Sequence, residues 1–409
     1  MAQVSQPKVG LLLGIVQRSL VRMKLIHLSD IRLDRSFVGA SLPPEVCNAC
    51  RDGLKAALEQ ILHHAVTVQA DAVLVAGNLL EGARYLPSTL HWLKERLEDL
   101  GDIPVCIAAG ERDPLSSGSP YTRGLWPDNV HFFDDTWSVW EIADTSLSVA
   151  GCARSCLETG LPTFPESLWK TPSAHRVALA PVMPAPEARH ALKPVMHPAL
   201  EQAHYLALGG NGPTCRIVED ALARIGYPAI PPLEHAIAVQ PTQFLEVSFT
   251  DSPDSGATVQ VSPRELDATV LLVQQVTCDE EQSAEALLRR LEDDIAQLKV
   301  APERLVLRLI LGGSLSLKVR GVLPEIQESL AERLLYLELV DETQPQGFYA
   351  DYAPSPTTLG RFLQRVGLEI DDAPDTRRWR VLCRAREAGW VAFHPEIPFP
   401  ARGVQEDIL

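Results

Sequence analysis

Unbroken runs of apolar residues mark three buried strands near the start of the chain. They cover Met23–Leu28, Asp71–Ala76 and Ile103–Ala109, and each run passes directly into polar or glycine residues. Apolar runs of this length without alternation are typical of strands buried on both faces of a parallel sheet. Because ligands bind at the carboxyl ends of such strands, the polar residues that follow them are the first candidates for a functional site.

Two segments with helical spacing separate these strands. The first begins at Ser41, where a capping residue and early prolines favour a helix start, and it continues to His64. The second covers Pro87–Leu100. Strand, helix, strand, helix, strand predicts two right-handed crossover units, and therefore an α/β sheet with helices on its faces.

After Asn129 the pattern changes to short strands, and prolines near 228–232 predict a domain boundary at 230–243. Beyond it we expect a hairpin at 244–249 and 257–261, then an α+β module up to Val340, and finally two helices. The expected division is an N-terminal extension, a main domain, an accessory domain and a helical C-terminal region, at 1–22, 23–235, 236–345 and 346–409.

Composition and charge narrow the classes of function. No apolar run reaches the roughly 18 to 20 residues that a membrane span needs. The formal net charge is −16, and residues 231–409 carry −12 of it. An acidic surface repels phosphate backbones, so contact with DNA would need a local basic patch or a partner protein.

The cysteines indicate no disulfide framework. The chain has eight, and the pair Cys47 and Cys50 lies early in the first predicted helix, where a structural role is expected. A reducing cytoplasm is therefore the expected compartment.

The strand-end clusters carry a family resemblance. The motifs are 27–32 (HLSDIR), 76–78 (AGN) and 110–113 (GERD), with weaker matches at 177–181 and 205–212. Over about residues 23–230 the chain resembles the SbcD-type DNA-repair exonuclease subunits, including their YhaO-like relatives, of the calcineurin-like metallophosphoesterase superfamily. The resemblance implies an α/β fold of layered sheets flanked by helices, followed by a smaller α+β domain.

The same motifs depart from the family at its metal ligands. The family holds two divalent ions, usually manganese, that activate water for attack at phosphorus. Here the residual ligand positions are Asp30, Asn78 and Glu111, and Asn78 stands where the family has the bridging aspartate. The expected imidazoles are replaced, two of them by Arg32 and Arg112. As an open alternative, shifted ligands could come from His175, His190, His197 or His204.

Arginine cannot bind a metal, so the two replacements predict a different kind of site. If Arg32 and Arg112 point into the site, their charges would neutralise the neighbouring acidic residues Asp30, Glu111 and Asp113. Salt bridges, or a bound anion, would then replace the cations of the family.

An arginine-rich stretch near the C-terminus is the one strong basic patch. At 3.6 residues per turn Arg377, Arg380 and Arg384 share a helix face. This face is either an ordinary exposed surface or a docking surface for a partner. SbcD-like proteins hold a coiled-coil ATPase of the SbcC type with the region after their phosphoesterase domain, and the resemblance implies such a partner, with DNA reached through the complex.

Three functions follow. The favoured one is a catalytically inactive pseudo-nuclease, without a cofactor, that acts as a scaffold or binding subunit with an ATPase in DNA repair. The alternative is an active phosphodiesterase or exonuclease with a rearranged site for manganese or another divalent metal. The third is a metal-free anion site. The sequence leaves enzymatic activity uncertain, and formation of a homodimer open.

Overall fold

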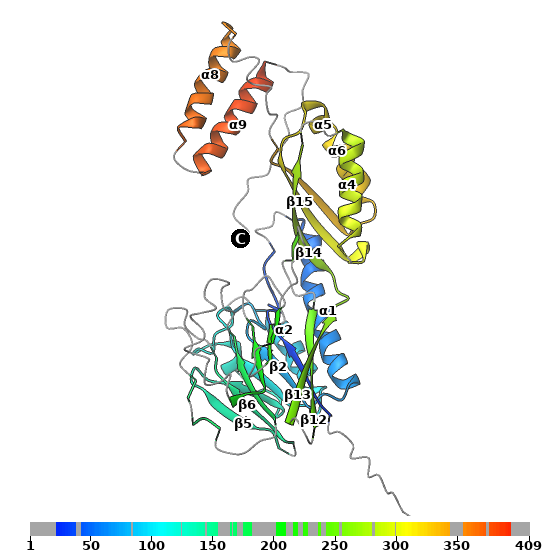
Figure 1. Ribbon diagram of the computed structural model, residues 1–409, viewed down its shortest axis with the longest axis vertical. Coiled ribbons are helices and arrows are strands. Elements are labelled where there is room, and N and C mark those ends of the chain that lie inside the picture. The colour runs from blue at the N-terminus through cyan, green and yellow to red at the C-terminus, as the bar shows by residue number, and fades with distance from the viewer. Residues whose placement is uncertain are drawn as a thin grey trace, which may run out of the picture.

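The computed structural model describes residues 22–37, 42–82, 85–123, 125–143, 145–153, 164–165, 167–169, 175–181, 202–209, 216–219, 224–227, 236–238, 243–252, 256–279, 283–298, 300–343, 355–373 and 376–393. Two six-stranded sheets pack face to face at one end of the molecule (Figure 1). A four-stranded sheet and a pair of helices continue the chain toward the other end.

The first sheet has the order β13-β12-β1-β2-β3-β4. Its parallel strands are β1 (Arg22–Leu28), β2 (Ala72–Ala76), β3 (Val105–Ala108) and β4 (Val130–Phe133). Helices α1 (Pro44–Thr67) and α2 (Pro87–Glu98) connect the first three strands. Every residue of β2 and β3 is buried, as the unbroken apolar runs predict.

The second sheet has the order β5-β6-β7-β8-β10-β9. Its strands are β5 (Ser138–Glu141), β6 (Leu147–Gly151), β7 (His175–Ala180), β8 (Tyr205–Leu208), β9 (Arg216–Glu219) and β10 (Arg224–Tyr227). Small and branched apolar side chains from both sheets form the core between them, while α1 and α2 cover the outer face of the first sheet.

The hairpin β12 (Gln243–Ser252) and β13 (Gly256–Glu265) is longer than predicted and lies in the first sheet. Strand β12 pairs antiparallel with β1 along six residues. The sequence had placed this hairpin in the accessory domain, because alternation shows that one strand face is buried but does not show which strand is its neighbour. The division at residue 235 therefore does not coincide with the boundary between the sheets.

The third sheet is built from β11 (Ala236–Ala238), β14 (Val270–Cys278), β15 (Leu305–Gly313) and β16 (Tyr336–Asp341), in that order. Helices α4 (Ala284–Ala296), α5 (Leu317–Gly321) and α6 (Leu323–Ala331) connect its parallel strands and pack on one face. The predicted α/β class, with layered sheets flanked by helices, is confirmed.

Helix α1 joins the first and third sheets. Its core cluster includes Leu271 of β14 and Val306 of β15. The Gln60 side chain donates to the Asp267 carbonyl at 2.6 Å and accepts from the Asp267 N–H at 2.8 Å. In Figure 1 the helix runs from the face of the first sheet toward the third.

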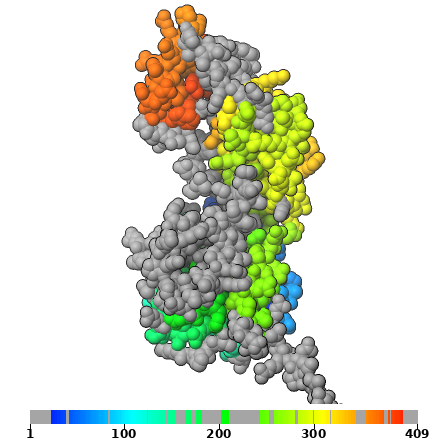
Figure 2. All heavy atoms as spheres, in the orientation of Figure 1, coloured from blue at the N-terminus to red at the C-terminus, as the bar shows by residue number. Residues whose placement is uncertain are grey.

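Two helices end the described chain, α8 (Thr358–Asp371) and α9 (Thr376–Ala392), and they separate at the predicted break near 371–374. Figure 2 shows them as a lobe at one end of the molecule. Glu387 of α9 pairs with the buried Arg320, which also binds Asp341 at 2.8 Å. In the described part of the chain no helix combines the length and the apolar character needed to cross a membrane.

Candidate functional site

The three strand ends meet as predicted. The loops after β1 and β2 are joined by backbone hydrogen bonds, from Asp30 N to the Gly77 carbonyl at 3.0 Å and from Arg32 N to the Asn78 carbonyl at 2.8 Å. The loop after β3 lies beside them, because Arg112 N donates to Asn78 Oδ1 at 3.0 Å. Polar residues from all three loops are therefore in contact at one edge of the sheet.

Left-handed backbone conformations shape these loops. Asp30, Arg32, Asp34 and Asn78 have φ angles of 59°, 53°, 63° and 55°. Aspartate and asparagine tolerate this region, whereas arginine rarely adopts it. The Arg32 conformation is held at both ends, by its backbone bond to Asn78 and by its side-chain bonds to Glu81.

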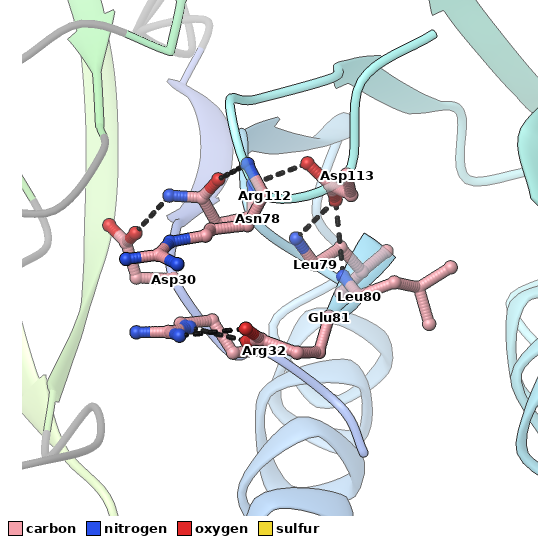
Figure 3. Close-up of polar contacts among 8 residues, drawn as sticks. All are labelled: Asp30, Arg32, Asn78, Leu79, Leu80, Glu81, Arg112 and Asp113. Carbon is pink, nitrogen blue, oxygen red and sulfur yellow. Dashed lines mark hydrogen bonds and ion pairs between the residues drawn. The ribbon is translucent and has the colours of Figure 1, made fainter. Parts of the chain in front are cut away.

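Asn78 is the buried centre of the cluster. Its Nδ2 donates to Asp30 Oδ1 at 2.6 Å, while its Oδ1 accepts from Arg112 N. Ser29 Oγ donates to the other carboxylate oxygen of Asp30 at 2.9 Å. Both ends of the Asn78 amide are thus engaged by protein groups (Figure 3).

This donor set does not fit the two-metal centre of the family that the strand-end motifs resemble. An amide nitrogen does not ligate a divalent cation, and here the amide nitrogen of Asn78 is the atom that faces Asp30. The half-buried Glu111 side chain makes no hydrogen bond or ion pair with the described residues. Among those residues, no three His, Cys, Asp or Glu side chains are grouped so that they could hold a metal.

Arg32 pairs with Glu81, which the sequence reasoning missed as a site residue. Its Nε and Nη2 donate to the two Glu81 oxygens at 2.7 and 2.9 Å, and both side chains are about 15% exposed. Burial alone would raise the Glu81 pKa, but the hydrogen bond and charge of Arg32, with the charges of Arg112 and Arg35, hold it below its usual value. The expected partners were Asp30, Glu111 and Asp113, and none of them takes this position.

Asp113 is fully buried and organises the loops after β2 and β3. Four backbone N–H groups donate to its carboxylate, from Asn78 (3.0 Å), Leu79 (2.7 Å), Leu80 (3.1 Å) and Gly110 (2.8 Å). The Tyr121 hydroxyl donates to it as well. Burial raises the Asp113 pKa to about 6, while these hydrogen bonds act in the opposite direction. Asp113 binds neutral donors here, in place of the predicted salt bridge.

Two of the four candidate histidines lie far from this site. His175 begins β7 and His204 directly precedes β8, whereas the loops of the site follow the carboxyl ends of β1, β2 and β3, where Pro181 after β7 approaches Gly77. At about 3.3 Å per residue, the six residues of β7 separate its two ends by roughly 20 Å. His190 and His197 lie outside the described residues.

The candidate docking arginines lie on α9, as predicted. The side chains of Arg377 and Arg380 lie outside the described part, and Arg384 is half-buried. Their docking role stays a prediction.

Replacing Arg32 by methionine is expected to lower the free energy of unfolding by about 2 kcal/mol, because it leaves Glu81 buried without its partner. Since the Glu81 pKa is lowered in the folded state, the pair's contribution is complete above the unfolded pKa near 4.5 and is lost as the pH falls below it. The difference between the two proteins in urea unfolding should therefore shrink below pH 4.5. Arg365→Met, at an exposed pair with Glu369, is the control and should change stability by less than about 0.5 kcal/mol; equal effects at both sites would contradict the assignment.

Some known proteins align with parts of this chain in sequence or in structure. No family model matches the chain. A protein of Bacillus subtilis (strain 168), named uncharacterized metallophosphoesterase YhaO, is 35% identical over 118 residues, which is 28% of this chain and 28% of that protein. Among solved structures, TT1561 of Thermus thermophilus aligns with a TM-score of 0.34 and 16% identity, over 54% of this chain and 93% of its own. A single mutant of Vps29 from Entamoeba histolytica aligns with a TM-score of 0.26 and 12% identity, over 59% of this chain and 100% of its own. Part of this chain is therefore similar in sequence to a protein named as a metallophosphoesterase, in agreement with its strand-end motifs.

Proposed function

We propose that this chain is a metallophosphoesterase-type protein in which direct hydrogen bonds and ion pairs replace the metal centre. It acts as a binding or scaffold subunit, with an SbcC-like coiled-coil ATPase, in DNA repair, and does not cleave DNA itself. The observation that supports this most is the 2.6 Å hydrogen bond between Asn78 Nδ2 and Asp30 Oδ1.

The short contact between Asn78 Nδ2 and Asp30 Oδ1 limits the charges that the two side chains can carry. In a two-metal site the ligand oxygens converge on cations, which neutralise them. An aspartate at position 78 would place two carboxylates at hydrogen-bond distance, where they would repel each other unless a cation neutralised both. An asparagine removes the repulsion and supplies a donor, so Asp30 and Asn78 are stable in contact with each other. The residues at this position therefore need no cation to hold them together.

The ATPase partner rests on the resemblance to SbcD-type subunits and on the helical pair that follows the third sheet. The net charge of −16 is consistent with DNA being reached through a partner, since an acidic protein repels phosphate backbones. Size-exclusion chromatography with an SbcC-like ATPase tests this role: co-elution is expected, and separate elution would contradict it.

The loss of the metal centre is tested by metal content. Protein purified with added manganese should contain well under one equivalent by mass spectrometry, and the same sample should leave linear duplex DNA intact. Asp30→Asn is the matched variant, and its metal content should equal that of the wild type. Two equivalents of manganese that fall in this variant, together with manganese-dependent cleavage, would establish the active phosphodiesterase instead.

A further inference from the structure

Two guanidinium groups at the strand ends keep donors that no described residue uses. Arg32 binds Glu81 through Nε and Nη2, which leaves its Nη1 available. The side chain of Arg112 is exposed and makes no hydrogen bond or ion pair with the described residues. Figure 3 shows both guanidinium groups on the side of Asn78 where Asp30 lies. Their remaining N–H groups therefore face the same region.

Two of the carboxylates nearby, Asp30 and Asp34, are already engaged by neutral donors. Asp30 accepts from Asn78 and Ser29, and Asp34 accepts from Leu86 N at 2.6 Å and from Thr89 Oγ1 at 2.8 Å. All four of these donors are neutral, and neither acid pairs with Arg32 or Arg112.

Three positively charged arginines surround Glu81. The charges of Arg32, Arg112 and Arg35 all act on this one carboxylate. The pKa of Arg35 is lowered to about 10, first by burial and then by the charges of Arg32 and Arg112, while the charges of Glu81 and Asp30 act in the opposite direction. Guanidinium groups that are this close repel one another, and an anion between them would relieve the repulsion.

Resting on the proposed loss of the metal centre, we propose that Arg112 and the Nη1 group of Arg32 bind an oxyanion of the phosphate class directly, without a metal ion. A planar guanidinium matches two phosphate oxygens at once, which makes paired arginines suited to this ligand. Arg32 is fixed in position by Glu81, and the exposed Arg112 contacts the anion from the solvent side. The site retains the ligand and has no metal-activated water with which to cleave it.

Isothermal titration with inorganic phosphate, in EDTA and at constant ionic strength, tests this inference. We expect saturable binding to the wild type and at least tenfold weaker binding to Arg112→Gln. Because the Arg112 side chain is exposed and its backbone N–H remains, the variant should keep its fold, which its unfolding curve checks. Arg333→Gln, at an exposed arginine of the accessory domain, makes the same change in net charge and should bind phosphate like the wild type.

The outcomes separate the two proposals. Equal binding by Arg112→Gln and wild type, or no binding by either while the metal content stays near zero, would overturn the anion site and leave the proposed function standing. Phosphate binding that requires added manganese would overturn both.

Discussion

Replacing Asp113 by asparagine is expected to lower the free energy of unfolding by about 3 to 5 kcal/mol, measured by urea unfolding at pH 8. The carboxylate accepts hydrogen bonds from four backbone N–H groups and from Tyr121 in a fully buried position. An asparagine amide would point its NH₂ group at two or more of these donors, whichever way it turned. Each buried donor left without an acceptor costs about 1 to 3 kcal/mol.

Two variants separate this effect from a general loss of charge. Asp102→Asn, at an exposed position, should change stability by less than about 0.5 kcal/mol. Tyr121→Phe removes one donor and leaves no backbone N–H unpaired, so a loss of about 1 kcal/mol is expected. If Asp113→Asn unfolds within about 1 kcal/mol of the wild type, the carboxylate does not organise the loops as described.

Replacing Gly209 by alanine is expected to cost about 3 kcal/mol, because there is no room for a methyl group at this position. A Cβ atom there would lie 2.3 Å from the carbonyl oxygen of Ala76 and 2.5 Å from Ser29 Cβ. Ala76 ends β2 and Ser29 directly follows β1, so Gly209 is a point where the second sheet packs closely against the start of the site loops. Backbone atoms cannot move aside as the end of a flexible side chain can.

Gly367→Ala is the matched control. Gly367 lies inside α8 and an added Cβ would have no neighbour within 4 Å, so alanine should raise stability by about 0.5 to 1 kcal/mol through its helix propensity. The same glycine-to-alanine change is therefore expected to lower the free energy of unfolding at Gly209 and to raise it at Gly367, as measured by thermal or urea unfolding. A loss of less than about 1 kcal/mol at Gly209 would mean that the sheets can separate at their ends.

The sequence predicted the parallel strands and the meeting of their ends, because unbroken apolar runs and parallel order are local signals with a fixed geometric consequence. It did not predict the partners within the site. Arg32 binds Glu81 from a left-handed backbone position, which no pattern of residue types predicts. Tyr121 reaches Asp113 from a three-residue 3₁₀ helix (Pro120–Thr122), and no periodicity marks so short an element. Contacts that depend on backbone turns and on non-local strand pairing were therefore outside the range of sequence reasoning.

The hairpin β12–β13 and the helix α1 have a consequence for how this chain can be divided. The chain leaves the third sheet after β11, adds two strands to the first sheet, and returns to the third sheet with β14. Neither unit is a continuous segment, so a single cut between β11 and β13 would remove strands from both, and a cut between β13 and β14 would separate β11 from the rest of the third sheet. Helix α1 also packs in one apolar cluster with side chains from both the first and the third sheet. Heat or denaturant would therefore expose apolar surface of the two units together. The two packed six-stranded sheets and the third sheet should then unfold as one cooperative unit, and neither should fold when it is cut out alone.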